Sequence, residues 1–145
     1  MFSNGHGGTG NGSSGHSMVP VYEYGARELV GYKSYLPDGF SGVCSLDVGP
    51  QHLNGLGMLH GGIVSMLLDN GCGIAVRNVL GDVDAAAVTV SVGVNFIDSA
   101  SEGLVTGGGD VVGGDRSMKF AEAELRDAAG RLLATCNATF RVFTK

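Results

Sequence analysis

The chain has 145 residues, of which 43% are hydrophobic and 16% charged, which suits one domain with one sizeable core. Its formal net charge is -5 at pH 7 and its nine Lys and Arg residues are scattered, so no binding to nucleic acid is expected. No uninterrupted apolar run reaches the roughly 18 residues that a membrane span needs, so no membrane contact is expected either.

Residues 1–18 are rich in Gly, Ser and Asn and contain no apolar segment typical of a secretory signal. The sequence therefore predicts a flexible tail over residues 1–18, a single folded domain over residues 19–145 and a cytoplasmic location. Cys44, Cys72 and Cys136 are widely spaced and odd in number, which is typical of neither a disulfide framework nor a zinc site. Each lies among small or apolar neighbours, so we expect three buried thiols, no metal and no cofactor.

The first half of the domain shows weak strand patterns followed by one strong helical pattern. Residues 21–36 predict one strand, Pro37-Asp38-Gly39 a turn, residues 40–48 a second strand, and residues 51–59 a loop. Residues 61–80 predict a helix that is apolar on nearly every side and therefore buried on most sides.

Two glycines, Gly71 and Gly73, lie inside this predicted helix and cost about 1 kcal/mol each relative to alanine. A helix that tolerates them predicts close approach to another backbone, and they also fit a helix pressed against a neighbouring subunit. Gly81 is a plausible C-terminal stop.

After Gly81 the pattern changes to a period of two, which is typical of strands. Residues 85–97 alternate, which predicts one face formed by Val88, Val90, Val92, Val94 and Phe96. Further strands are predicted over residues 104–112, 117–125 and 132–143, with residues 127–130 as a hairpin connection. The order predicts an α+β fold in which the long helix packs on an antiparallel sheet.

Two features of the predicted helix point to chemistry. Asp69 follows Met66-Leu67-Leu68, and a carboxylate in so apolar a segment needs partners or a wet cleft. His60-Gly61-Gly62 begins the helix, where backbone N–H groups lack intrahelical partners and could stabilise an oxyanion. Taken separately, Asp69 could be a structural acid and the glycines an ordinary helix entry.

Taken together, these residues resemble the PaaI-like branch of hotdog thioesterases. In that signature a polar amide residue lies six positions before the His of His-Gly-Gly and an acid nine positions after it, as Asn54, His60 and Asp69 do. Residues 89–96, 114–117 and 127–134 are similar to later elements of the family. The resemblance implies the hotdog fold, a long central helix wrapped by an antiparallel sheet of five to six strands.

The resemblance also implies an activity and a set of roles. The reaction would be hydrolysis of an acyl-CoA thioester to acid and CoA, with CoA as part of the substrate rather than a cofactor. Asp69 would be nucleophile or general base, the Gly61 N–H would polarise the carbonyl, and Asn54 would orient water or carbonyl. The remaining roles fall to His60, which would support the Gly61 geometry, Gly62 in substrate binding, and Ser91, the hydroxyl residue near the acid.

Helix geometry adds a quaternary prediction. Asp69 lies eight residues beyond Gly61, roughly 12 Å along the helix at 1.5 Å per residue. The two can serve one thioester only if they come from different subunits, so a homodimer with two shared sites is predicted. The family resemblance further implies a dimer of dimers.

Several side chains are candidates for contacts with the rest of the substrate. Arg77, Arg116 and Lys119 could bind the phosphates of CoA, although each could equally be an ordinary surface charge. Candidates for the acyl pocket are Met66, Leu67, Cys72 and Phe96. The alternatives to a thioesterase are a non-catalytic acyl-CoA or fatty-acid binding module, which would not need Asp69, and an enoyl-thioester hydratase.

Overall fold

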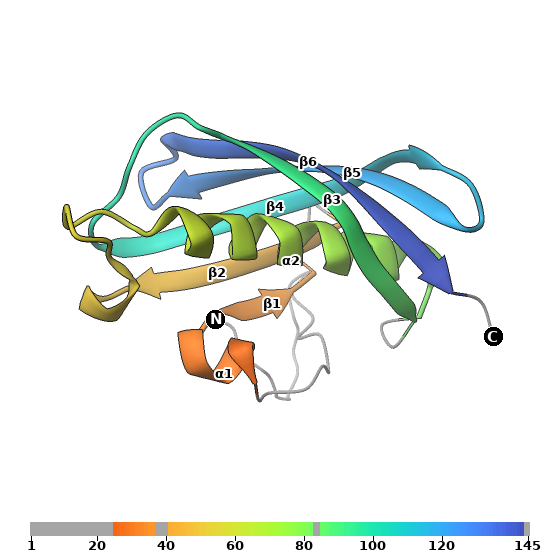
Figure 1. Cartoon of the computed structure of the whole chain (residues 1–145), viewed down its shortest axis with the longest axis horizontal. Helices are drawn as coiled ribbons and strands as arrows, with labels where there is room; N and C mark the ends of the chain where they lie inside the picture. The colour runs from red at the N-terminus through yellow and green to blue at the C-terminus, as the bar shows by residue number, and fades with distance from the viewer. Residues whose placement is uncertain (1–24, 37–40, 83–84, 144–145) are drawn as a thin grey trace, which may run out of the picture.

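The computed structural model describes residues 25–36, 41–82 and 85–143. In this part of the chain one antiparallel six-stranded sheet, in the order β1-β2-β4-β5-β6-β3, curves around a single long helix, α2 (Figure 1). The elements in chain order are α1 (Ala26–Val30), β1 (Lys33–Tyr35), β2 (Gly42–Val48), the 3-10 helix η2 (Pro50–His52), α2 (Gly61–Leu80), β3 (Ala86–Phe96), β4 (Gly103–Gly114), β5 (Met118–Asp127) and β6 (Leu132–Phe143). This arrangement confirms the predicted α+β hotdog fold.

Helix α2 has the bounds that its sequence predicts. His60 is its N-cap and Gly81 ends it with φ at 72°, a left-handed conformation that glycine adopts without strain. By length and composition alone α2 could cross a membrane, but nine of its residues are buried within the domain, as in the core helix of a globular protein. Its packing against the sheet therefore explains its apolar sequence.

Glycines bring α2 unusually close to the sheet. A Cβ on Gly42 of β2 would lie 2.5 Å from the Ala75 nitrogen, and one on Gly109 of β4 would lie 3.0 Å from the Gly71 carbonyl. Gly71 in turn faces the Gly107 carbonyl at 3.3 Å from its own notional Cβ. The predicted backbone approach is thus confirmed within one chain. A neighbouring subunit is not needed to explain Gly71. Gly73 differs from the prediction, because its notional Cβ meets the side chains of Arg77 and Phe140 of the same chain, at 3.3 and 3.5 Å, and not another backbone.

The N-terminal part of the domain differs from its prediction. Residues 21–36 do not form one strand, because the short helix α1 occupies Ala26–Val30 and only Lys33–Tyr35 pair with β2. Gly31 ends α1 at a φ of 90°, so glycine here separates two short elements. The predicted turn at Pro37-Asp38-Gly39 and the predicted tail lie outside the described residues. The later strands and the hairpin after Asp127 are confirmed.

Strand β3 has a bulge that changes which side chains face the helix. Thr89 pairs with Phe140 of β6, but Ser91 pairs with the next residue, Thr139, so Val90 is an extra residue. Phe140 is buried against the helix side and Thr139 alternates away from it. The prediction of one continuous apolar face on β3 is therefore wrong, because the alternation reverses at Val90.

Candidate functional site

Asp69 lies in the middle of α2 and faces β3. The Thr89 hydroxyl donates a hydrogen bond of 2.6 Å to Asp69 Oδ1. The carboxylate is half-buried rather than fully enclosed, so it avoids most of the cost of burying a charge. One oxygen is thus held by a neutral donor while the other is available to water or substrate.

Ser91, predicted to lie beside this acid, does not do so in the chain. It follows the Val90 bulge, and its partner Thr139 belongs to the outer face of the sheet, away from α2. The hydroxyl beside Asp69 is that of Thr89, two residues earlier. The family resemblance implied a hydroxyl residue on this strand, and the bulge determines which one reaches the helix.

The start of α2 has one free backbone donor. His60 Nδ1 accepts from the Gly62 N–H at 2.8 Å, and the His60 carbonyl accepts from Ile63 and Val64. Within the described residues no acceptor is found for the Gly61 N–H. This donor therefore carries the positive end of the helix dipole and can polarise a carbonyl or stabilise an oxyanion. His60 acts as a helix cap, consistent with the supporting role implied for it.

The Asn54 side chain is partly committed to its own loop. Its Oδ1 accepts from the Leu56 N–H at 2.9 Å and the Met58 N–H at 3.1 Å. Its side-chain amide N–H groups remain as the donors that it can offer to a ligand. Asn54 is therefore suited to donate to a carbonyl, and it is not free to accept a proton from water through Oδ1.

A cavity of about 250 Å³ joins several of these groups at the N-terminal end of α2. It is lined by Asn54, Gly61, Val64, Phe96 and Leu133, among others. A Cβ on Gly61 would lie 3.4 Å from the Phe96 ring, so glycine leaves the backbone N–H accessible next to an aromatic wall. Of the four acyl-pocket candidates, Phe96 lines this cavity, whereas Leu67 and Cys72 are fully buried core residues.

Asp69 does not line this cavity. The two halves of the candidate site, Asp69 with Thr89 and Gly61 with Asn54, are separated by two turns of α2, about 12 Å of helix. Within one chain the structure brings together the members of each half, but it does not bring the halves together.

The predicted CoA-binding cations lie at the end of the domain opposite Gly61, where α2 ends and β4 turns into β5. Arg77 is in the last turn of α2, about 24 Å along the helix from Gly61, and its guanidinium donates to the Ala85 and Ala87 carbonyls. Arg116 is exposed in the turn between β4 and β5, and Lys119 is a half-buried residue of β5.

Sequence reasoning missed a cation beside the Gly61 cavity, Arg131. It lines an adjoining hollow of about 430 Å³ and forms ion pairs with Asp98 at 3.0 Å and Asp127 at 3.2 Å. The hollow also contains Glu102, so its carboxylates outnumber its single cation. It is therefore a poor phosphate site despite the arginine.

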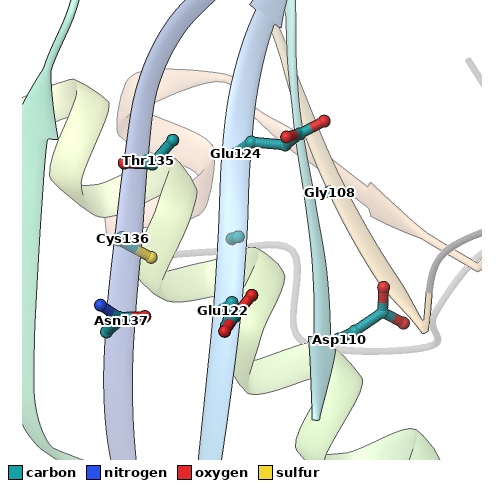
Figure 2. A pocket seen from close by; sticks show the side chains of 8 residues that line it. Gly108, Asp110, Glu122, Glu124, Thr135, Cys136 and Asn137 are labelled. Carbon is teal, nitrogen blue, oxygen red and sulfur yellow. The ribbon is translucent and has the colours of Figure 1, made fainter. Parts of the chain in front are cut away.

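A third hollow, of about 330 Å³, lies on the outer face of the sheet and contains none of the predicted site residues (Figure 2). Asp110, Glu122 and Glu124 project from β4 and β5 around it. Its acidic rim does not favour an anionic ligand, and it has no connection in the described residues to Asp69 or Gly61.

Comparisons with known proteins agree with this fold. The sequence profile of the thioesterase superfamily matches residues 56–134, a segment that includes His60, Gly61, Asp69 and Thr89. Among curated proteins none matches this chain.

Three solved structures illustrate the likeness. The BH2602 protein from Bacillus halodurans, solved with CoA, is 26% identical over 69% of this chain and 70% of its own, with a TM-score of 0.65. The conserved protein PA5202 from Pseudomonas aeruginosa is 27% identical over 83% of this chain and 95% of its own, with a TM-score of 0.74. The PaaI protein of the E. coli phenylacetic acid degradation operon is 19% identical over 81% and 83%, with a TM-score of 0.71, a likeness of fold.

A long helix in a curved antiparallel sheet defines a hotdog protein, and this helix carries an acid and has a free N–H at its start. The profile match covers more than half of the sequence. The chain belongs to the thioesterase superfamily.

Proposed function

We propose that the protein hydrolyses an acyl-CoA thioester to a free acid and CoA, and that it belongs to the PaaI-like branch of its superfamily. The observation that carries the proposal is the pairing of a Thr89-held Asp69 carboxylate with an unused Gly61 N–H on one helix. A non-catalytic binding module would have no need for the acid, and a CoA-containing structural neighbour supports a CoA ligand.

In the proposed reaction the Gly61 N–H, assisted by the Asn54 amide, donates to the thioester oxygen and stabilises the charge that develops there. Asp69 acts through the oxygen not held by Thr89. As a general base it removes a proton from water as water attacks the carbonyl. As a nucleophile it forms an anhydride, which water then opens. In both routes the carbon–sulfur bond breaks and the departing CoA thiolate gains a proton.

The two routes leave different labels. In a single turnover in H₂¹⁸O, the general-base route places the label in the acid product alone. The anhydride route, when water attacks the acyl carbon, does the same, but attack at the Asp69 carbonyl places the label in the protein. Intact-mass analysis over repeated turnovers therefore detects an anhydride opened at Asp69.

We infer that each site is formed by two subunits, since Asp69 and Gly61 of one chain cannot reach one carbonyl. Strand β3 offers the surface for this pairing. It is the last strand of the sheet, so one of its edges has no partner among the described residues. Its apolar side chains are unusually exposed, Val88 at 50%, Val90 at 58% and Phe96 at 59%. A long apolar edge of this kind is a template for pairing with a second copy.

The contacts of the two site halves predict where the two-fold axis passes. Phe96 lies beside Gly61, and Thr89 lies beside Asp69. If Asp69 meets the partner subunit's Gly61, the axis passes Ser65 on α2 and falls between Val92 and Gly93 on β3. One two-fold axis is therefore compatible with both α2 and β3. Antiparallel pairing of the two β3 strands would join the two sheets into one.

This pairing would also place the cationic end of one chain beside the Gly61 end of its partner. Arg116 and Lys119, which lie at the end of the sheet far from Gly61 in their own chain, would then lie on the side from which CoA leaves the shared site. We propose them as contacts for CoA phosphates, with Arg77 in a lesser role because its guanidinium is hydrogen-bonded to the Ala85 and Ala87 carbonyls. Stacking of two dimers would give the tetramer.

Release of free thiol from a panel of aliphatic and aromatic acyl-CoAs tests the activity and identifies the acyl group. We expect turnover of at least one member and loss of that turnover in Asp69→Ala. Tight acyl-CoA binding by calorimetry without thiol release would instead establish the binding module. Hydration of an enoyl-CoA without thiol release would establish the hydratase.

A further inference from the structure

Two cysteine side chains that the proposed reaction does not use meet across the interface between α2 and the sheet. Cys72 Sγ on α2 and Cys136 Sγ on β6 are 3.7 Å apart. Both side chains are buried, with 0% and 3% exposure. Figure 2 shows Cys136 on β6, beside the strand that carries Glu122 and Glu124 and in front of α2. The third cysteine, Cys44, lies separately on β2.

We propose that Cys72 and Cys136 form an oxidisable thiol pair, and that the resulting disulfide lowers turnover at the Asp69 site. With hydrogen peroxide as oxidant, the Cys136 thiol loses its proton, its sulfur attacks one peroxide oxygen to become a sulfenic acid, and the departing hydroxide takes up that proton as water. The Cys72 sulfur then displaces the sulfenic hydroxyl as a second water, and the sulfur–sulfur bond forms. Overall, two thiols and one hydrogen peroxide give one disulfide and two waters.

The surroundings assign different parts to the two thiols. The two thiols share one hydrogen bond in which either sulfur can be the donor, and with Cys72 as the donor this bond lowers the pKa of Cys136 and raises that of Cys72. The backbone N–H of Ala123 also favours the Cys136 thiolate. Cys136 also lines the hollow on the outer face of the sheet, which Cys72 does not, so Cys136 is the attacking sulfur and Cys72 the resolving one. Burial raises the pKa of Cys44 to about 12, so this thiol is a matched buried control.

Formation of the disulfide would disturb the site because each cysteine is close to an element that carries a site residue. A disulfide bond is about 2.05 Å long, so the two sulfurs must approach by about 1.6 Å. The helix cannot simply move inward near Cys72, since its backbone already touches that of Gly109. Cys72 lies one turn beyond Asp69, and Cys136 pairs with Val94 of β3, the strand that carries Thr89. The movement would therefore disturb the hydrogen bond between Asp69 and Thr89.

The direct test treats the full-length chain with hydrogen peroxide or with diamide and measures intact mass, free thiols and turnover. We expect a mass loss of about 2 Da with diamide, one free thiol remaining, and a cross-linked peptide containing Cys72 and Cys136. Turnover should fall between about 10- and 100-fold, the range for a displacement on the order of 1 Å at a reacting group, and return with dithiothreitol.

Three variants sharpen the test. Cys44→Ala should form the same cross-link and lose the same activity, whereas Cys72→Ser and Cys136→Ser should keep full turnover after oxidation. The proposal would be overturned if all three thiols remain at oxidant levels that leave the chain folded, or if a cross-link forms through Cys44. A disulfide between Cys72 and Cys136 that leaves turnover unchanged would also overturn it. The mass and thiol measurements do not depend on acyl-CoA hydrolysis, so failure of this site is distinguishable from failure of the proposed function.

Discussion

Replacing Thr89 with valine removes the hydroxyl that holds Asp69 while keeping the volume and β-branched shape of the side chain. The lost bond is short, 2.6 Å, and its acceptor is a carboxylate. Hydrogen bonds to charged groups contribute about 1.5–3 kcal/mol. Because Asp69 is only half-buried and water can replace part of the bond, we expect the lower end, about 1.5 kcal/mol.

That free energy corresponds to a decrease of about 10-fold in kcat. The effect should fall on kcat more than on KM, since Thr89 positions the acid and does not line the Gly61 cavity. The assay is thiol release from a saturating acyl-CoA substrate, with urea unfolding of each variant to show that the fold is retained.

Two further variants act as controls. Thr89→Ser keeps the hydroxyl and should keep most of the activity. Ser91→Ala, on the outer face of the sheet after the bulge, should leave kcat within about twofold of the original chain, as expected for a surface change. Unchanged turnover in Thr89→Val, or an equal loss in Ser91→Ala, would refute the assignment of Thr89 as the residue that positions Asp69.

Three other predictions follow from the same contacts. Gly61→Pro removes the free N–H at a helix position that accepts proline, and the preceding His60, with ψ at 132°, is compatible with it. We expect kcat to fall about 100- to 1,000-fold. Gly61→Ala, which keeps the N–H, should lose far less activity. Gly42→Ala should destabilise the fold by about 1–3 kcal/mol or more in urea unfolding, because its Cβ would meet the α2 backbone. Gly55→Ala, where a Cβ would meet open space, should be nearly neutral. Equal stabilities of the two variants would contradict the described packing. Val90→Lys should weaken self-association, measured by sedimentation, and turnover together. Val112→Lys, at the same 58% exposure on β4, should change neither. A fully active monomer would contradict the shared site.

The features that sequence predicted well are those set by local chemistry. The bounds of α2 follow from a cap at His60 and a stop at Gly81, which act within one turn of the helix. The role of Gly71 followed from the cost of glycine in a helix, which implies a compensating close contact. The predicted acid and free N–H, Asp69 and Gly61, are both accessible in the structure.

The features that sequence could not predict depend on contacts between distant elements. The Val90 bulge is a feature of the pairing between β3 and β6, and no local pattern distinguishes Thr89 from Ser91 as the partner of Asp69. The pair of Cys72 and Cys136 joins residues 64 positions apart, so single-residue reasoning predicted only that each would be buried. Arg131 lacked a signal because its place beside the Gly61 cavity depends on the fold of the closing hairpin.

A site that takes Asp69 from one subunit and Gly61 from the other is most directly tested by mixing two inactive chains. Asp69→Asn and Gly61→Pro homodimers should each be nearly inactive. After subunit exchange at equal amounts, about half of the dimers are mixed and each has one intact site, so about one quarter of the original activity should return. Mixed dimers that are verified by differential tagging and are no more active than their parents would contradict the shared site.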